Sequence, residues 1–291
     1  MRDVVICSGV RTAIGTFGGA LAGTPPCGLA TLVAREAIAR SKAEAPDVEQ
    51  SIFGNVIHTE PRDMYLARVA AIGAEMPDTA PALTLNRLCG SGLQAVVSAA
   101  EQIMLDRADI ILAGGAENMS RVGHLMSAAR FGAKMGDVTA TDMMTGALTD
   151  PFGNGHMGVT AENIAQECEI SRVAQDAFAV QSHERASAAI DAGHFNDQIL
   201  PVQVRHGRKE VSFDTDEHVR RDVSLGDLEK LRPAFSRDGS VTPGNASGIN
   251  DGAAAIVLAE AGAAERAGAK PRARVLGYAH AGVRPEVMGL G

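Results

Sequence analysis

The chain has 291 residues, which is long enough for a sizeable core and, by length alone, suggests about two domains. Hydrophobic residues make up 45% of it, but no run approaches the roughly 18 apolar residues of a membrane span, so a membrane protein is excluded. The formal net charge is −8 and the basic residues form no long block, which argues against nucleic acid as a partner.

The cysteines and the N-terminus narrow the class further. The four cysteines have no C-x-x-C spacing and no clustered histidine partners, so neither a disulfide framework nor a metal site is expected. The first residues run directly into a short apolar stretch and are too short and too early in acid for a signal peptide, which places the protein in the cytoplasm. Aromatic residues reach only 3% while glycine reaches 32 residues, a composition that favours closely packed α/β layers.

Strands and helices alternate in the first part of the chain. Apolar runs predict strands and periodic apolar faces predict helices; in chain order they are a strand at 4–8, a helix at 28–45, a strand at 51–57, a helix at 64–75, a buried strand at 81–85, a helix at 93–104 and a strand at 109–113. This alternation indicates a mainly parallel sheet covered on both faces. Ligand chemistry is then expected at the carboxyl ends of the strands.

The alternation breaks down between residues 121 and 247. Glycine and methionine are frequent there, and long helices are predicted at 160–168 and 171–192, so this stretch is interpreted as a large insertion or lid. An apolar run at 253–259 predicts a strand that returns to the first sheet, and a further strand is predicted at 274–280. The last residues contain no closing element, so a further domain is expected to begin there.

A sharp elbow joins the predicted strand at 81–85 to the helix at 93–104. It spans Asn86 to Leu93 and contains Cys89 followed by Gly90 and Gly92. At the start of a helix, unpaired N–H groups and the positive end of the dipole favour a thiolate over a thiol. The pattern is typical of a nucleophile, although a lone cysteine at a helix start is more often a small buried apolar residue.

Four separated blocks together resemble thiolases, in particular bacterial β-ketothiolases (acetyl-CoA acetyltransferases). They are the elbow, the run Gly114 to Ser120, the segment His156 to Asn163 and the segment Gly244 to Gly252. The resemblance implies a thiolase-like layered α/β fold of two similar halves, with a mainly parallel mixed sheet in the first half and a truncated C-terminal half. The expected domains are 1–120 with 248–270, an inserted CoA-binding loop domain at 121–247, and the start of an incomplete C-terminal domain at 271–291.

Site residues follow from the resemblance, position by position. Cys89 is expected to attack an acyl thioester, and the residues expected to hold coenzyme A are His156, Met157, Arg220, Phe235 and Ser247. In that assignment His156 lines the pantetheine channel, Ser247 contacts the pantetheine arm, Met157 and Phe235 form channel walls, and Arg220 lies beside the nucleotide end. Without the resemblance, the sequence around each residue predicts a loop histidine for His156, a turn residue for Ser247 and an exposed cation for Arg220.

The resemblance also implies the partners. The substrates are acyl-CoA and CoA or acetyl-CoA, no cofactor is bound permanently and no metal is needed, because the thioester supplies the leaving group. The protein is expected to be a homo-oligomer, either a dimer or a tetramer.

Three segments of the family do not occur in this sequence. They are Asn-Glu-Ala-Phe, a Gly-His-Pro whose histidine activates the nucleophile, and a Cys-x-Gly-Gly whose cysteine acts as acid and base. A general base contributes about 10²–10⁴-fold to a rate, so the leading hypothesis of a thiolase-type acyltransferase has an alternative. That alternative is a non-catalytic remnant or partner subunit that retains the CoA channel. A β-ketoacyl synthase is disfavoured, because the blocks at His156 and Ser247 resemble thiolase features.

Overall fold

The computed structural model describes residues 2–291, which group into two compact units. Unit 1 comprises residues 2–121, 196–217 and 250–278, and unit 2 comprises 122–195, 218–249 and 279–291. Residues 196–217 thus group with unit 1, although they fall inside the range expected for the inserted domain. The assignment of separate domains with separate roles stays a prediction.

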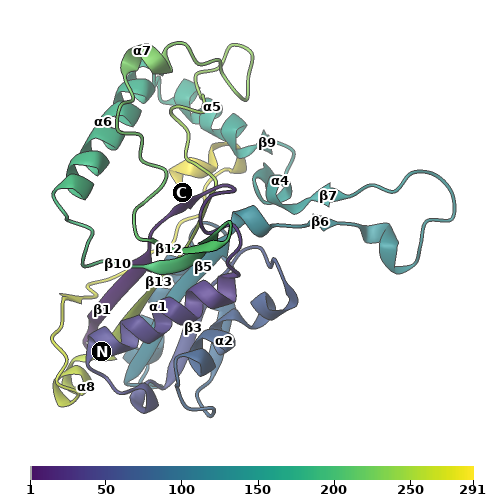
Figure 1. Ribbon diagram of the computed structural model, residues 1–291. Coiled ribbons are helices and arrows are strands. Elements are labelled where there is room, and N and C mark those ends of the chain that lie inside the picture. The colour runs from purple at the N-terminus through teal and green to yellow at the C-terminus, as the bar shows by residue number, and fades with distance from the viewer. Residues whose placement is uncertain (1) are drawn as a thin grey trace. The chain divides into compact units, whose positions relative to one another are not determined.

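A mixed sheet forms the centre of unit 1 (Figure 1). Its order is β10-β1-β13-β5-β3-β4, made of β10 (Ile199–Leu200), β1 (Val4–Thr12), β13 (Asn250–Glu260), β5 (Ile110–Asn118), β3 (Gln50–Gly54) and β4 (Ala82–Leu85). β1, β5, β3 and β4 run in one direction, and β13 lies antiparallel between β1 and β5. The predicted mainly parallel mixed sheet is therefore confirmed, and the apolar run at 253–259 does return to it.

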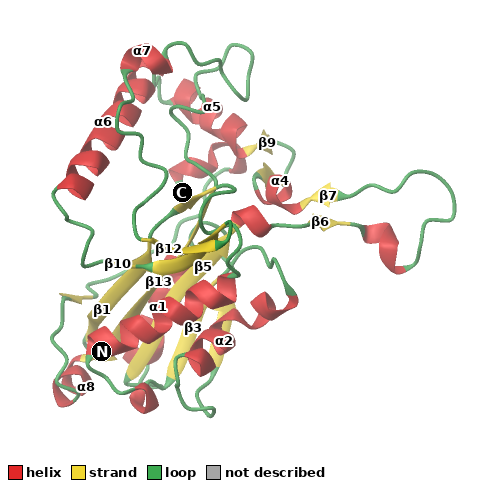
Figure 2. Ribbon diagram, viewed as in Figure 1, coloured by secondary structure: helices red, strands yellow, loops and turns green. Residues whose placement is uncertain are grey.

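Helices cover both faces of this sheet (Figure 2). α1 (Pro26–Ser41) and α2 (Leu66–Gly73) share one buried cluster with sheet residues such as Val5 and Phe53. α3 (Ser91–Met104) shares a second cluster with Val4 and Ile52, whose side chains point to the opposite face because neighbours alternate along a strand. The layered α/β packing expected from the composition follows from these two clusters.

Shorter elements complete unit 1. They are β2 (Gly15–Thr16), η1 (Ala45–Asp47), η2 (Pro61–Tyr65), η3 (Met119–Arg121), the hairpin of β11 (Val202–His206) and β12 (Lys209–Phe213), α8 (Ala261–Arg266) and β14 (Ala273–Arg274). The predicted helix at 64–75 thus begins with a 3-10 turn, and the strand predicted at 274–280 is reduced to two residues.

One strand differs in burial from its prediction. The run at 81–85 predicts a buried strand, but β4 is exposed at Ala82 and Leu83 and half-buried at Thr84 and Leu85. β4 ends the sheet order and pairs only with β3 among the described strands. An edge strand without a neighbour on one side cannot be buried as a central strand is, and apolar content alone does not distinguish the two.

Unit 2 is built mainly of helices. It contains β6 (His124–Leu125), η4 (Ser127–Arg130), β7 (Thr141–Asp142), α4 (Met143–Ala147), β8 (Thr149–Asp150), β9 (Gly155–His156), α5 (Met157–Glu167), α6 (Arg172–Asp191), α7 (Leu225–Leu228) and η5 (Pro285–Leu290). α6 matches the predicted 171–192, since the Ser171 side chain accepts a hydrogen bond from the Ala174 N–H and caps the helix. α5 begins three residues earlier than predicted.

Residues 2–291 lack two features, a helix that could span a membrane and a cluster that could hold a metal ion. No helix in that range is long and apolar enough to cross a membrane. The same residues contain no cluster of three or more histidine, cysteine, aspartate or glutamate side chains arranged to hold a metal ion.

Candidate active site

Cys89 lies in the elbow between β4 and α3, as the sequence predicts. It precedes Gly90, the N-cap of α3, and its side chain is exposed. Cys168 is also exposed, whereas Cys7 and Cys27 are buried. Burial raises the pKa of Cys7, and burial together with the nearby Asp63 raises the pKa of Cys27 to about 12. The two buried thiols are therefore kept protonated and inert.

Hydrogen bonds within the elbow fix its shape. The Ser91 hydroxyl accepts from the Arg87 N–H at 2.8 Å and donates to the Leu88 carbonyl at 2.6 Å. The Asn86 side chain accepts from the Leu88 N–H at 2.8 Å and donates to the Val56 carbonyl at 3.2 Å. Leu88 has a φ of 47°, in the left-handed region that a non-glycine residue rarely adopts. These side-chain bonds hold an unfavourable backbone conformation immediately before the cysteine.

The elbow also depends on a close approach between β3 and α3. A Cβ atom on Gly54 would lie 2.7 Å from both the backbone carbon and the Cβ of Ser91 and 2.9 Å from the Gly92 nitrogen. Only glycine lets the end of β3 pass this close to the first turn of α3. The sequence carries this signal only as one glycine at the end of a predicted strand.

A half-buried carboxylate supports the loop beside the elbow. Glu117, at the end of β5, accepts the N–H groups of Val56 at 2.8 Å and Ile57 at 3.0 Å. Burial raises the pKa of Glu117, while these two N–H groups act in the opposite direction. Because the Val56 carbonyl binds Asn86, Glu117 supports the elbow through the loop after β3.

In unit 2, the structure brings His156 and Phe235 together. Their rings stack with centroids 4.8 Å apart and planes 15° apart. His156 is also the N-cap of α5, where its Nδ1 accepts the Gly158 N–H at 3.0 Å. A Cβ on Gly158 would lie about 2.2 Å from the Phe235 ring, so glycine is required where the ring packs. Met157, half-buried, begins α5 beside His156.

Ser247 is exposed and follows a turn at residues 242–245. The Asn245 and Ala246 N–H groups both donate to the Thr242 carbonyl, at 3.2 and 3.0 Å. Upstream, the Ala234 N–H donates to the Val241 carbonyl at 2.9 Å, which ties the Phe235 segment to this turn.

Arg220 is exposed and lies in a cluster of basic groups. Its backbone N–H donates to Nδ1 of His183 on α6 at 3.2 Å, and the rings of His183 and His218 stack with centroids 6.3 Å apart. Burial first, then the charges of His218 and Arg220, lowers the pKa of His183. Such a cluster suits an anionic ligand group, and sequence reasoning identified only Arg220 of it.

Cys89 thus lies in unit 1 and the other five sequence-predicted residues lie in unit 2. Sequence reasoning missed the supporting roles of Ser91 and Glu117. It also missed Glu162, whose carboxylate accepts the N–H groups of Ser240 and Val241, and Asp176, whose carboxylate accepts from Arg172 and Asn245. For Asp176 a signal was available, since an arginine four residues earlier on a predicted helix indicates an ion pair on one face.

The fold and the elbow define an α/β protein that presents an exposed cysteine at a strand-to-helix turn. Residues 4–262 match the N-terminal domain of thiolases. The whole chain is 60% identical to the β-ketothiolase BktB of Cupriavidus necator and 46% identical to an acetyl-CoA acetyltransferase of the same organism, and spans 74% of each. The chain therefore belongs to the thiolase family.

Solved structures agree with this assignment. The crystal structure of the Bacillus anthracis acetyl-CoA acetyltransferase is similar over the whole chain and 74% of its own length, with a TM-score of 0.96 and 44% identity. The human mitochondrial 3-ketoacyl-CoA thiolase in complex with CoA is similar over the whole chain and 73% of its own length, with a TM-score of 0.95 and 38% identity. The recognition of a thiolase from four short sequence blocks is confirmed.

Proposed function

We propose that this chain performs thiolase-type acyl transfer, with Cys89 as the nucleophile and acyl-CoA as the acyl donor. The observation that supports it most is the elbow. Cys89 is exposed one residue before the N-cap of α3 and directly after a left-handed Leu88. An exposed thiol at a helix start, on a backbone held in a rare conformation, is the arrangement of an activated nucleophile.

The reaction proceeds in two steps, transfer of the acyl group from the CoA sulfur to the Cys89 sulfur and then formation of a carbon–carbon bond. The Cys89 thiolate attacks the carbonyl carbon of acyl-CoA, the bond from that carbon to the CoA sulfur breaks, and CoA leaves as a thiolate that takes up a proton. The acyl group is then bound to Cys89. Loss of a proton from the methyl group of acetyl-CoA gives a carbanion, and this proton balances the one taken up by CoA. The carbanion attacks the acyl carbonyl carbon, the bond from that carbon to the Cys89 sulfur breaks, and a 3-oxoacyl-CoA and the Cys89 thiolate result; the reverse sequence is thiolysis.

CoA is proposed to bind unit 2. The stacked His156 and Phe235, with Met157 beside them, provide an apolar wall with one polar edge for the pantetheine arm. Ser247 offers an exposed hydroxyl to the same arm, and Arg220 offers positive charge to the phosphates. In this proposal CoA is a substrate and no metal takes part.

Two measurements test the proposal. The first is the acetylation of Cys89 by acetyl-CoA, detected by mass spectrometry of the peptide, and the second is thiolysis of acetoacetyl-CoA, followed by loss of the enolate absorbance. We expect both in the 291-residue chain and neither in Cys89→Ala. A folded wild-type chain in which acetyl-CoA leaves Cys89 unmodified contradicts the proposal.

The second candidate function is a CoA-binding thiolase subunit without turnover. The Gly-His-Pro and Cys-x-Gly-Gly segments do not occur in these 291 residues, which span 74% of the length of the β-ketothiolase BktB. The same two assays separate the candidates, because this subunit would bind CoA without catalysing thiolysis.

A homo-oligomer, dimer or tetramer, belongs to the same proposal. The segment between β6 and β7 of unit 2, a long loop in Figure 1, carries Phe131 and Met135 with side chains 92% and 95% exposed. Large apolar side chains exposed to this degree are typical of surfaces that associate. Light scattering of the wild type and of Phe131→Ser with Met135→Ser tests whether this segment carries the contact.

A further inference from the structure

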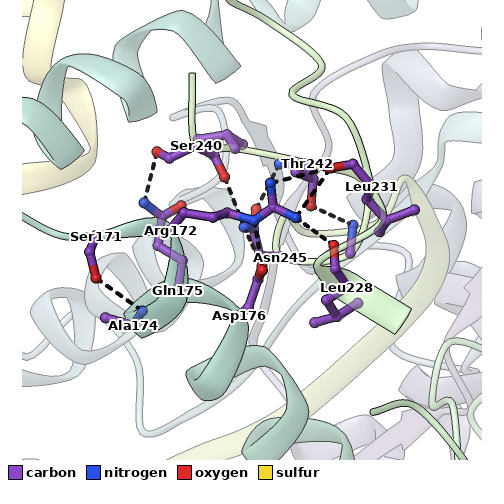
Figure 3. Close-up of polar contacts among 12 residues, drawn as sticks. Ser171, Arg172, Ala174, Gln175, Asp176, Leu228, Leu231, Ser240, Thr242 and Asn245 are labelled. Atoms are coloured by element: carbon purple, nitrogen blue, oxygen red, sulfur yellow. Dashed lines mark hydrogen bonds and ion pairs between the residues drawn. The ribbon is translucent and has the colours of Figure 1, made fainter. Parts of the chain in front are cut away.

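A buried carboxylate in unit 2 joins two chain segments that are far apart in sequence. Asp176 on α6 is 2% exposed, and its two oxygens bind different partners (Figure 3). Oδ2 accepts from Arg172 Nε at 2.6 Å, and Oδ1 accepts from Asn245 Nδ2 at 2.9 Å. A buried charge is costly unless it is paired and hydrogen-bonded, so both partners are needed to keep Asp176 in place.

The Asn245 side of this network closes the turn before Ser247. The Asn245 side-chain oxygen accepts the Thr242 N–H at 2.8 Å, and its amide donates to the Ser240 carbonyl at 3.0 Å as well as to Asp176. Every polar group of this side chain therefore has a partner, and two residues further on the chain reaches Ser247. The hydrogen bond from Asn245 to Asp176 therefore fixes the orientation of that turn relative to α6.

The Arg172 side reaches the segment that carries Phe235. The guanidinium donates to the carbonyls of Leu228, at the end of α7, and of Leu231 (Figure 3). The turn that contains Gly244 also packs tightly against the segment of Leu228 and Leu231. A Cβ on Gly244 would lie only 2.5 Å from Leu228 Cδ2 and 2.6 Å from Leu231 Cδ1. Arg172 and Asp176 together therefore connect the turn before Ser247 with the chain that leads to Phe235.

We propose that Asp176 is a positioning residue for CoA, which sets the turn bearing Ser247 against the segment bearing Phe235 before the ligand arrives. This inference rests on the proposed function, since it concerns the residues proposed to hold the pantetheine arm. When the loops of a site are already ordered in the free protein, the free-energy cost of ordering them does not reduce the affinity for the ligand. Loss of the link is therefore expected to weaken CoA binding without touching the ligand.

The test is calorimetric titration of the 291-residue chain with CoA. Asp176→Asn keeps the shape of the side chain but removes its charge, and we expect its dissociation constant to rise about tenfold, because small misplacements of binding groups are expensive. The matched control is Glu184→Gln, an exposed residue of the same helix, for which we expect a change within about twofold. Cys89 should react with iodoacetamide at the wild-type rate in both variants, because it lies in unit 1.

Each other outcome counts against a definite part of the proposal. If Asp176→Asn binds CoA as the wild type does while its urea midpoint falls, Asp176 stabilises the fold and positions nothing. If the folded wild type itself shows no CoA binding, the proposed function fails and this inference fails with it. If Asp176→Asn does not fold, the proposal is tested with Arg172→Lys, because lysine keeps the ion pair with Asp176 but cannot also reach the two carbonyls. We expect this variant to bind CoA about threefold more weakly. An unchanged dissociation constant for CoA overturns the proposal.

Discussion

The elbow before Cys89 and the turn before Ser247 are both tight turns that present an exposed side chain, but they are held by different means. Within the elbow, the bonds that fix the backbone come from neutral side chains close in sequence, Ser91 and Asn86, and Glu117 adds only indirect support through the loop after β3. The turn is held by a buried charge 69 positions away, on α6. Hydrogen bonds between residues close in sequence can be inferred from one short motif, whereas a hydrogen bond between distant residues is revealed only by the folded structure.

The two turns also differ in strain. The elbow contains Leu88 in a left-handed conformation, which costs a non-glycine residue roughly 1–2 kcal/mol. In the segment that enters the turn, the N–H groups of Ser240 and Val241 donate hydrogen bonds to the carboxylate of Glu162 on α5. Variants of the elbow should therefore change the reactivity of Cys89, and variants of the turn should change the affinity for CoA.

The largest expected effect is that of Gly54→Ala, at the end of β3 where it passes the elbow. The new Cβ would meet the backbone of α3 at 2.7 Å, and backbone cannot move aside as a flexible side chain does. We expect the free energy of unfolding to fall by about 3 kcal/mol, the upper range for overpacking, and acetylation of Cys89 to slow. Urea unfolding and mass spectrometry measure the two effects.

The control for this substitution is Gly92→Ala in the first turn of α3. A Cβ there meets nothing within 4 Å, and alanine is a better helix former than glycine by about 1 kcal/mol. We expect unchanged or slightly higher stability. Equal destabilisation by both substitutions would mean that the close approach at Gly54 is not the cause.

A smaller effect is expected in the turn, for Glu162→Gln. The Glu162 carboxylate accepts the Ser240 N–H at 2.8 Å, the Val241 N–H at 2.8 Å and the Ser240 hydroxyl at 2.9 Å. Burial opposes its charge, but these three donors hold the pKa of Glu162 below its ordinary value. Removing a charged acceptor of this kind should lower the free energy of unfolding at pH 7 by about 1.5–2 kcal/mol.

The pH dependence of that loss follows from the lowered pKa. The stabilisation by the wild-type carboxylate is complete above its ordinary pKa and is lost as pH falls through the lower value of the folded state. The stability difference between wild type and Glu162→Gln should therefore shrink in acid. Glu167→Gln on the same helix, where the carboxylate pairs with an exposed Arg284, should cost about 0.5 kcal/mol or less at pH 7.

The contrast between the two turns also explains what could be predicted from the sequence. The alternation of strands and helices in unit 1, the elbow and the position of Cys89 follow from local periodicity and local motif, and the structure places them as expected. The exposure of β4 was missed, because an apolar run does not reveal whether a strand lies at the edge or the centre of a sheet.

Long-range contacts account for the remaining gaps. The stack of His156 on Phe235 joins residues on separate segments and depends on the absence of a side chain at Gly158. Asp176 and Asn245 carry no signal that links them before the chain is folded. Such pairs are fixed by packing of whole elements, which no short window of sequence contains.

Ser91→Ala tests the hydrogen bonds of the elbow. The substitution leaves the Arg87 N–H and the Leu88 carbonyl without their side-chain partner, and we expect about 1 kcal/mol of lost stability together with slower acetylation of Cys89. Ser98→Ala on the same helix removes only the acceptor of the Gln94 side chain and should leave Cys89 unaffected. Equal acetylation rates for Ser91→Ala and wild type would show that the hydroxyl does not orient the cysteine.

The smallest change in stability is expected for Leu88→Gly, because two terms oppose each other. Glycine removes the cost of the left-handed conformation, but it raises the entropy of the unfolded chain by an amount worth about 0.5–1 kcal/mol. The net change should lie between about zero and 1.5 kcal/mol in favour of glycine, while the freer backbone lets Cys89 leave its reactive orientation and slows acetylation severalfold. Glu75→Gly, at another left-handed residue beyond the end of α2, should show a similarly small change in stability with no change at Cys89. If both variants acetylate Cys89 at the wild-type rate, the conformation of Leu88 is a consequence of the turn and plays no part in presenting the nucleophile.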